Sequence, residues 1–163
     1  MKNNMRIRQI REKDNQRLAE IVRSNLKANH LDLPGTVYFD QGLEHLSEYY
    51  LASTQRNYYV LTNDEDMMIG GIGFAEFDGF EKCAELQKLY LCDEAKGNGY
   101  GYDLIEYVCQ EAKKAGYEQM YLETHTNLAT AIHMYEKVGF QQIERPKDCV
   151  HSTMNRFYIK KLI

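Results

Sequence analysis

The stretch KGNGYG, Lys96 to Gly101, constrains the fold of this chain more than any other segment. It follows a strand-like apolar run, Cys83–Cys92, and leads directly into a helical pattern that starts at Tyr100. Its three glycines leave the backbone bare where the helix begins, and the first N–H groups of a helix are unpaired and lie at the positive end of the helix dipole. The stretch therefore predicts a strand–turn–helix unit whose turn can hold an anionic group such as a phosphate.

The common nucleotide-binding patterns fit this turn poorly. A Walker A loop needs a Lys-Ser or Lys-Thr pair after its last glycine, and none follows here. The dinucleotide pattern GxGxxG needs a glycine at position 102, where the chain has Tyr102. From the turn alone, two alternatives stay open: a nucleotide-binding fold, and a glycine turn that only connects its neighbours, because isolated glycine motifs are weak signals.

Hydrophobic periodicity predicts the other elements of the fold. The expected strands are Met5–Ile10, Asn57–Asn63, Met67–Phe77, Cys83–Cys92, Gln119–Thr124, Phe140–Ile143 and Met154–Ile163. The expected helices are Glu12–Ala28, Leu43–Ala52, Tyr100–Ala115 and Asn127–Val138. This order predicts an α/β (α+β) fold with a mixed, mainly antiparallel sheet, and 163 residues suit a single domain, 1–163.

Composition and charge narrow the classes of partner. The net charge is −4, so no nucleic-acid partner is expected, because phosphate binding depends on a surplus of Lys and Arg. No run approaches the roughly 20 apolar residues of a membrane span, and the first residues have no apolar signal core. We therefore expect no membrane partner and a cytoplasmic location.

The four cysteines, Cys83, Cys92, Cys109 and Cys149, show no CxxC spacing, and no His/Cys cluster has the spacing of a zinc site. We expect them to be buried, reduced thiols and expect no metal.

The wider stretch around the turn resembles the GNAT superfamily of N-acetyltransferases. KGNGYG is similar to that family's pyrophosphate-binding pattern, Gln/Arg-x-x-Gly-x-Gly/Ala, with Lys96 standing where the family usually has Arg or Gln. The resemblance continues in the flanking segments AELQKLYL and YLETHTNLATAIHMYEKVGF, and it covers roughly Cys83 to Ile143. It implies a sheet of about seven strands with helices on both faces. It also implies acetyl-CoA as co-substrate, held where two parallel strands, Glu85–Cys92 and Met120–Thr124, splay apart.

The resemblance assigns a set of residues to acetyl-CoA. Backbone groups of the strand would pair with the pantetheine arm, and the amides of the turn would hold the pyrophosphate. Asn127 would contact the cofactor, or cap the helix that it opens. The residues so assigned are Leu89, Tyr90, Leu91, Lys96, Gly97, Asn98, Gly99, Tyr100, Gly101, Tyr102 and Asn127.

The resemblance also implies two catalytic residues. Tyr135 matches the tyrosine that commonly donates a proton to the departing CoA thiolate, although by spacing alone it would be a core tyrosine. Glu85 matches the glutamate that some relatives use as general base on the attacking amine, with Glu123 and His125 in reserve. The implied reaction is direct attack in a ternary complex.

The acceptor is expected to be a small-molecule amine, with a protein amine as the alternative. The segment 29–50 is rich in aromatic and acidic side chains that could form the acceptor wall or pack the helices on the sheet. These side chains are Tyr38, Phe39, Asp40, Glu44 and Glu48. A non-catalytic CoA-binding sensor is a second class of function, and a homodimer is an expectation from the family alone.

Overall fold

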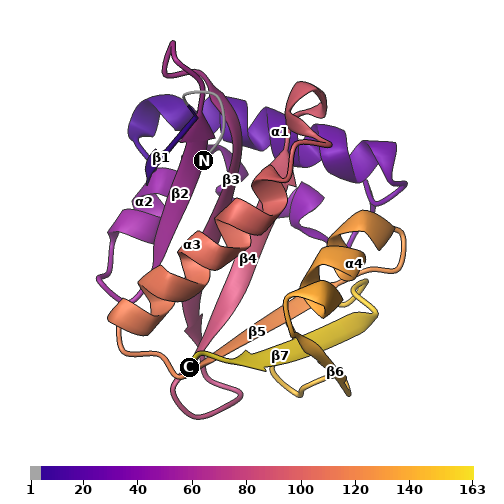
Figure 1. Cartoon of the computed structure of the whole chain (residues 1–163). Helices are drawn as coiled ribbons and strands as arrows, with labels where there is room; N and C mark the ends of the chain where they lie inside the picture. Colours follow the sequence, from indigo (N-terminus) through magenta and orange to yellow (C-terminus); the bar gives the residue numbers. More distant parts are fainter. Residues whose placement is uncertain (1–4) are drawn as a thin grey trace.

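The computed structural model describes residues 5–163, and its centre is one seven-stranded sheet (Figure 1). The strands are β1 (Arg6–Gln9), β2 (Asn57–Thr62), β3 (Met68–Phe77), β4 (Cys83–Leu91), β5 (Gln119–Thr124), β6 (Gln141–Ile143) and β7 (Arg156–Lys161). Their order across the sheet is β1-β2-β3-β4-β5-β7-β6, and β4–β5 is the parallel pair in an otherwise antiparallel sheet. The predicted mixed, mainly antiparallel sheet is confirmed.

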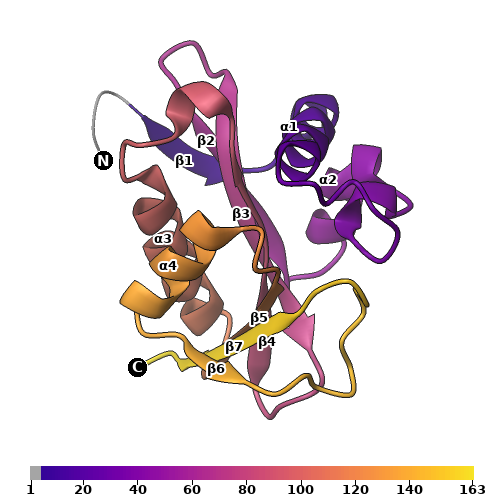
Figure 2. The ribbon, with the colours of Figure 1, turned by 90° about the vertical axis from the view of Figure 1, so that its right-hand side faces the viewer.

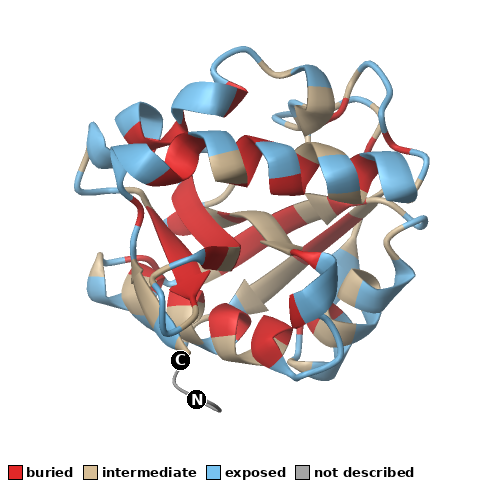
Figure 3. Cartoon of the chain, turned by 90° about the horizontal axis from the view of Figure 1, so that it is seen from above, coloured by how far each residue is buried: buried red, intermediate tan, exposed pale blue. Residues whose placement is uncertain are grey.

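Four α-helices cover the two faces of this sheet. They are α1 (Asn15–Ala28), α2 (Leu46–Leu51), α3 (Tyr100–Lys114) and α4 (Ala129–Lys137). Figure 2 shows α1 and α2 on one face and α3 and α4 on the other. Figure 3 shows buried residues where the helices face the sheet and exposed residues on their outer sides, as amphipathic helices require.

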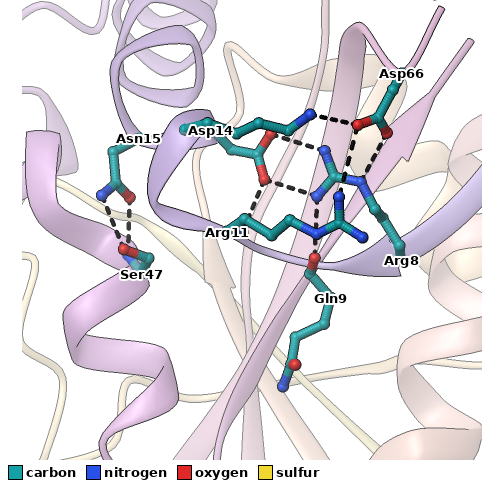
Figure 4. A network of polar contacts seen from close by, with 8 residues as sticks. Arg8, Gln9, Arg11, Asp14, Asn15, Ser47 and Asp66 are labelled. Carbon is teal, nitrogen blue, oxygen red and sulfur yellow. Dashed lines mark hydrogen bonds and ion pairs between the residues drawn. The ribbon is translucent and has the colours of Figure 1, made fainter.

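The predicted element boundaries agree with the structure to within three residues, including those of the helix expected over 43–52. That segment starts as a short 3-10 turn, Leu43–His45, before α2 begins. The start of α1 is fixed by side chains that lie far apart in sequence. Asn15 Nδ2 donates to Ser47 Oγ at 2.8 Å, and the Ser47 N–H donates to Asn15 Oδ1 at 2.9 Å, which ties α1 to α2 (Figure 4).

A second polar cluster holds the strand that precedes α1. Arg8 donates from both terminal nitrogens to Asp14, at 2.8 and 2.9 Å, and from Nε to Asp66 at 2.8 Å (Figure 4). The two-bond geometry to Asp14 is the strong form of this ion pair. It fixes the chain where β1 turns into α1, close to the turn between β2 and β3.

A bulge interrupts β4 next to β3. Gly71 pairs with Tyr90 and Gly73 pairs with Gln87, so β4 carries one residue more than β3 over this span. Lys88 lies in the bulge with a φ of +52°, the left-handed region that non-glycine residues seldom adopt. The buried Tyr58 holds the bulge, because its hydroxyl donates to the Lys88 carbonyl at 2.7 Å.

The parallel pair separates soon after it forms. β4 and β5 pair at Cys83–Gln119, Ala84–Met120 and Glu85–Tyr121, and the ladder ends there. Figure 1 shows the two strands side by side at their starts and diverging toward their ends. The predicted splayed pair is confirmed, and it opens the sheet beside Glu85.

Candidate active site

A cleft of about 660 Å³ occupies the opening between β4 and β5. Its walls come from β4, the glycine turn, the end of β5 and α4, together with parts of α1 and the loop after it. Every residue that the sequence assigned to the site lines this cleft, with the exception of Asn98. The lining members of that set are Glu85, Leu89, Tyr90, Leu91, Lys96, Gly97, Gly99, Tyr100, Gly101, Tyr102, Asn127 and Tyr135.

The glycine turn presents unpaired donors to the cleft. Gly97 and Gly99 have φ of +80° and +79°, and a Cβ at either position would meet open space, so the requirement for glycine here is conformational. None of the N–H groups from Gly97 to Tyr102 donates a hydrogen bond to another residue of the described chain. Six bare amides at the start of a 15-residue helix fit an anionic group such as a pyrophosphate.

Two side chains of the predicted cofactor set have other partners. Asn98 Nδ2 donates to the carbonyls of Ala95 and Lys96, each at 3.2 Å, which turns it away from the cleft. Lys96 Nζ pairs with Asp93 at 3.0 Å, although both side chains are exposed. At the end of β4, the Leu91 carbonyl accepts from Asn25 Nδ2 at 2.9 Å.

The prediction that Asn127 caps α4 is wrong. The helix begins at Ala129, its N-cap position is Leu128, and no side chain caps it. Asn127 Nδ2 instead donates to the carbonyl of Asn29 at 3.0 Å, which joins the end of α1 to the loop before α4. Asn127 therefore lies one residue before the N-cap position and connects two loops rather than capping the helix.

Glu85 is oriented by a chain of hydrogen bonds along β4. Gln87 lies two residues on, on the same face of the strand, and its Nε2 donates to Glu85 Oε1 at 2.9 Å. Gln87 Oε1 in turn accepts from the hydroxyl of Tyr50, in α2, at 2.6 Å. Burial, reinforced by the charge of Glu123, raises the pKa of Glu85 to about 7, so the carboxyl can take up a proton near neutral pH.

Tyr135 reaches the same cleft from α4. It is buried against Phe140, with the ring centroids 5.7 Å apart, and its hydroxyl has no hydrogen-bond partner among residues 5–163. Burial raises the pKa of Tyr135 above its ordinary value, so its hydroxyl stays protonated at neutral pH.

His151 is a residue of the cleft that the sequence did not reveal. Its Nδ1 lies 3.0 Å from Glu123 Oε1 and its Nε2 lies 2.9 Å from Asp40 Oδ2, while Glu123 also accepts from Tyr121 at 3.0 Å. Burial opposes a charge on this ring, but the hydrogen bonds to Asp40 and Glu123 outweigh burial and raise the pKa of His151 to about 9. His151 therefore carries a proton at neutral pH and is shared by two carboxylates.

The two reserve bases are both engaged. Glu123 is bound by His151 and Tyr121, and these bonds, against burial, hold the pKa of Glu123 below its usual value. His125 Nδ1 accepts the N–H of Asn127 at 3.0 Å, and His125 does not line the cleft. Glu85 is thus the carboxylate of the cleft best placed to act as a base.

The expected acceptor wall is only partly correct. Asp40 reaches the cleft through His151, but Glu44 pairs with Arg23 at 2.6 Å. Phe39 is 59% exposed, and Tyr38 packs against it and near Arg23. None of the predicted wall residues itself lines the cleft; the segment contributes Asn29, Thr36 and Val37 instead. The sequence could not give the direction of side chains in a segment without regular periodicity.

The cysteines are free, and two of them differ from the expectation. Cys83 and Cys92 are buried, whereas Cys109 and Cys149 are half-buried. Burial raises the pKa of Cys83 to about 12 and that of Cys149 to about 11.

In residues 5–163, no group of three or more His, Cys, Asp or Glu side chains could hold a metal ion. None of the helices described is long and apolar enough to cross a membrane.

Comparison with known proteins identifies the family. Residues 12–140 match the acetyltransferase (GNAT) family. The chain belongs to this family. Over 145 residues it is 30% identical to the uncharacterized N-acetyltransferase YjgM of Escherichia coli (strain K12), covering 88% of this chain and 86% of YjgM.

Solved GNAT structures share the fold. An acetyltransferase of the GNAT family from Staphylococcus aureus Mu50 has a TM-score of 0.83 at 22% identity, over 98% of this chain and 99% of that one. The structure of yncA from Salmonella typhimurium, with its cofactor acetyl-CoA, has a TM-score of 0.75 at 21% identity, over 99% and 95% of the two chains. The predicted GNAT fold and acyltransferase class are confirmed, with acetyl-CoA as the co-substrate of the family.

Proposed function

We propose that this GNAT protein transfers the acetyl group of acetyl-CoA to the primary amine of a small molecule, by direct attack within a ternary complex. One observation carries the proposal. One cleft, at the point where β4 and β5 separate, is lined by Glu85, by Tyr135 with its unpartnered hydroxyl, and by the glycine turn with its bare amides, Asn98 apart.

The residues divide the work according to their chemistry. Bound acetyl-CoA supplies the acetyl group as an activated thioester, and the amides of the turn hold its pyrophosphate. Glu85, with its pKa near 7, takes the proton from the ammonium of the acceptor so that the nitrogen can attack. Tyr135 Oη holds the proton that the departing sulfur needs, because its raised pKa keeps the hydroxyl intact.

The cysteines support direct transfer over a covalent acyl-cysteine route. Burial raises the pKa of Cys92 above its ordinary value, and burial together with Glu123 does the same for Cys149. A thiol is activated by a lowered pKa, so these side chains lack the property that a nucleophile needs.

The contacts between two loops beside the cleft favour a small acceptor over a protein side chain. The loop after α1 is fastened to the loop before β7: the Thr153 N–H donates to the Gly35 carbonyl at 3.1 Å, and Thr153 Oγ1 donates to the Pro34 carbonyl at 2.6 Å. The His151–Asp40 pair adds a third connection between the same loops. These contacts support a bounded acceptor pocket rather than an open groove.

The test is a titration of the protein with acetyl-CoA, followed by an assay of thiol release over a panel of amines. We expect binding, and release of CoA thiol with at least one small amine. Binding without release on any small amine or peptide would favour the sensor instead, and ATP or NAD binding as strong as acetyl-CoA binding would favour a nucleotide-binding fold. A cytoplasmic location, a homodimer and the absence of nucleic-acid partners stay predictions from the sequence.

A further inference from the structure

Lys88 is a cation of the cleft that has no carboxylate partner. Of the other basic side chains lining the cleft, Lys96 pairs with Asp93, and His151 pairs with Asp40 and Glu123. The remaining one, His133, is exposed on α4. Lys88 Nζ forms no hydrogen bond or ion pair with a described residue, and its nearest recorded contact is the ring of Tyr50, 5.9 Å from the ring centroid. An ammonium in a partly desolvated cleft attracts an anion when none is supplied internally.

The backbone at Lys88 has an unusual conformation that neighbouring residues stabilise. Its left-handed φ of +52° is unfavourable for a residue with a Cβ and persists only where the surroundings impose it. Tyr58 imposes it through the bond to the Lys88 carbonyl, and the Tyr58 ring lies against Gly71 and Gly73, where a Cβ would come within 2.5 and 2.6 Å of it. Strain of this kind concentrates at functional sites.

Lys88 lines the same cleft as Glu85 and Glu123. Burial lowers the pKa of Lys88, and the charges of three carboxylates, those of Asp40, Glu85 and Glu123, oppose this effect. Asp40 and Glu123 are both bound to the protonated His151, and one oxygen of Glu85 accepts from Gln87. The unsatisfied groups on this side are thus a base, Glu85, and a cation, Lys88, three residues apart on β4.

We infer that the acceptor is a primary amine that also carries a carboxylate, with its ammonium at Glu85 and its carboxylate on Lys88 Nζ. The inference rests on the proposed acetyl transfer. Such an acceptor adds no net charge to the cleft, and its carboxylate pairs with the one cation, Lys88, that Asp40 and Glu123 leave without a partner. Lys88 acts here as a specificity-determining residue.

The same charges discriminate against two other classes of amine. A diamine or polyamine would bring a second ammonium against Lys88, with Asp40 and Glu123 already engaged by His151. An aminoalkyl phosphate would bring two negative charges among three carboxylates, with a single free ammonium to receive them. A carboxylate matches the one charge that is unpaired.

The experiment compares amines in matched pairs that differ only in the anionic group. Amino acids from glycine to 6-aminohexanoate would each be assayed beside their carboxamides, with diamines and aminoalkyl phosphates as further arms. We expect kcat/KM to be at least about tenfold higher for the best amino acid than for its carboxamide, the ratio that a charge-assisted contact of about 1.5 kcal/mol gives.

Variants assign the preference to Lys88. We expect Lys88→Gln to remove the preference while leaving the KM for acetyl-CoA unchanged, and Lys88→Arg to retain most of it. Lys113→Gln, on the exposed side of α3 and away from this cleft, makes the same charge change and should keep the full preference. Because Gln and Lys experience the same left-handed backbone, the comparison isolates the charge.

The outcomes separate this inference from the proposed function. Two results would overturn the inference and leave acetyl transfer standing. One is a kcat/KM for carboxamides, diamines or phosphates that equals or exceeds the value for amino acids. The other is a carboxylate preference that the Lys88→Gln variant keeps. If acetyl-CoA binds but no amine releases thiol, calorimetric titration of the CoA-saturated protein with the same amino acids tests the inference instead. Binding that Lys88→Gln weakens at least about tenfold supports the inference, and no binding refutes it.

Discussion

The hydroxyl of Tyr58 donates to the carbonyl oxygen of Lys88 at 2.7 Å, across 30 positions of sequence, and so holds the β4 bulge next to the cleft. Two glycines of β3, Gly71 and Gly73, accommodate this arrangement, because a Cβ at either position would collide with the Tyr58 ring. At Gly71 a Cβ would lie 2.5 Å from Tyr58 Cε1, and the Tyr58 ring is fully buried and cannot give way.

Gly71→Ala should therefore destabilise the protein by roughly 2 kcal/mol, because overpacking a close-packed site forces neighbouring groups to shift. Urea unfolding measures the change. Gly42→Ala is the comparison: its φ is +80° but its Cβ would meet open space, so it carries backbone strain of about 1 kcal/mol without a collision. Equal losses for the two variants would show that the Tyr58 contact is not what requires glycine at 71.

The base assignment predicts the pH dependence of the reaction. Glu85 must be deprotonated to accept a proton, so kcat/KM should rise with pH through about 7. Glu85→Gln should remove that limb of the profile and lower kcat/KM by about 10²-fold or more. An unaltered limb in this variant would assign the titration to another group.

Gln87 offers a second test of the titration of Glu85. Its hydrogen bond favours the ionised form of Glu85, so Gln87→Leu should raise the pKa of Glu85 and move the limb to higher pH. Pre-steady-state rates of thiol release across pH measure it directly. A shift toward lower pH would contradict the role assigned to this contact.

Tyr135→Phe should lower kcat by about 10²-fold with little change in acetyl-CoA affinity, since the ring is kept and only the proton donor is lost. Tyr107→Phe serves as the control, because Tyr107 packs edge-on against Tyr59 on the far side of α3 and does not line the cleft. If the Tyr135→Phe variant kept wild-type turnover, the Tyr135 hydroxyl would have no role in the reaction.

Gly99→Val should abolish acetyl-CoA binding and leave the fold largely intact. The φ of +79° excludes a β-branched side chain, and the turn must rearrange where its amides are needed. Gly116→Val imposes similar strain at the other end of α3, with φ of +104° and equally open space, and should bind acetyl-CoA normally. Calorimetric titration compares the two; loss of binding in both would indicate general destabilisation.

His151 predicts how stability depends on pH. Its folded-state pKa of about 9 lies above its unfolded value of 6.5, so its contribution is complete below pH 6.5 and is lost as the pH rises through about 9. At most about 3 kcal/mol of the free energy of unfolding should disappear over this window, and His151→Gln should flatten the decline. His133→Gln, at an exposed site on α4, should retain it.

The sequence by itself determined the local structure of this protein. Periodicity placed each strand and most of each helix, because burial of one face leaves a regular mark on neighbouring residues. The glycine turn was also readable, since a positive φ at a helix start is a local demand that only certain residues meet. The family pattern then placed Glu85 and Tyr135 in one site.

Only the tertiary structure decided how distant segments meet in the cleft. His151 joins Asp40, 111 positions away, to Glu123, and no periodic signal marks any of the three as neighbours. The bulge at Lys88 depends on a tyrosine of β2 that packs over glycines of β3. Such contacts are set by which faces stack and where a strand pair separates, and these are properties of the assembled sheet that no local pattern of residues records.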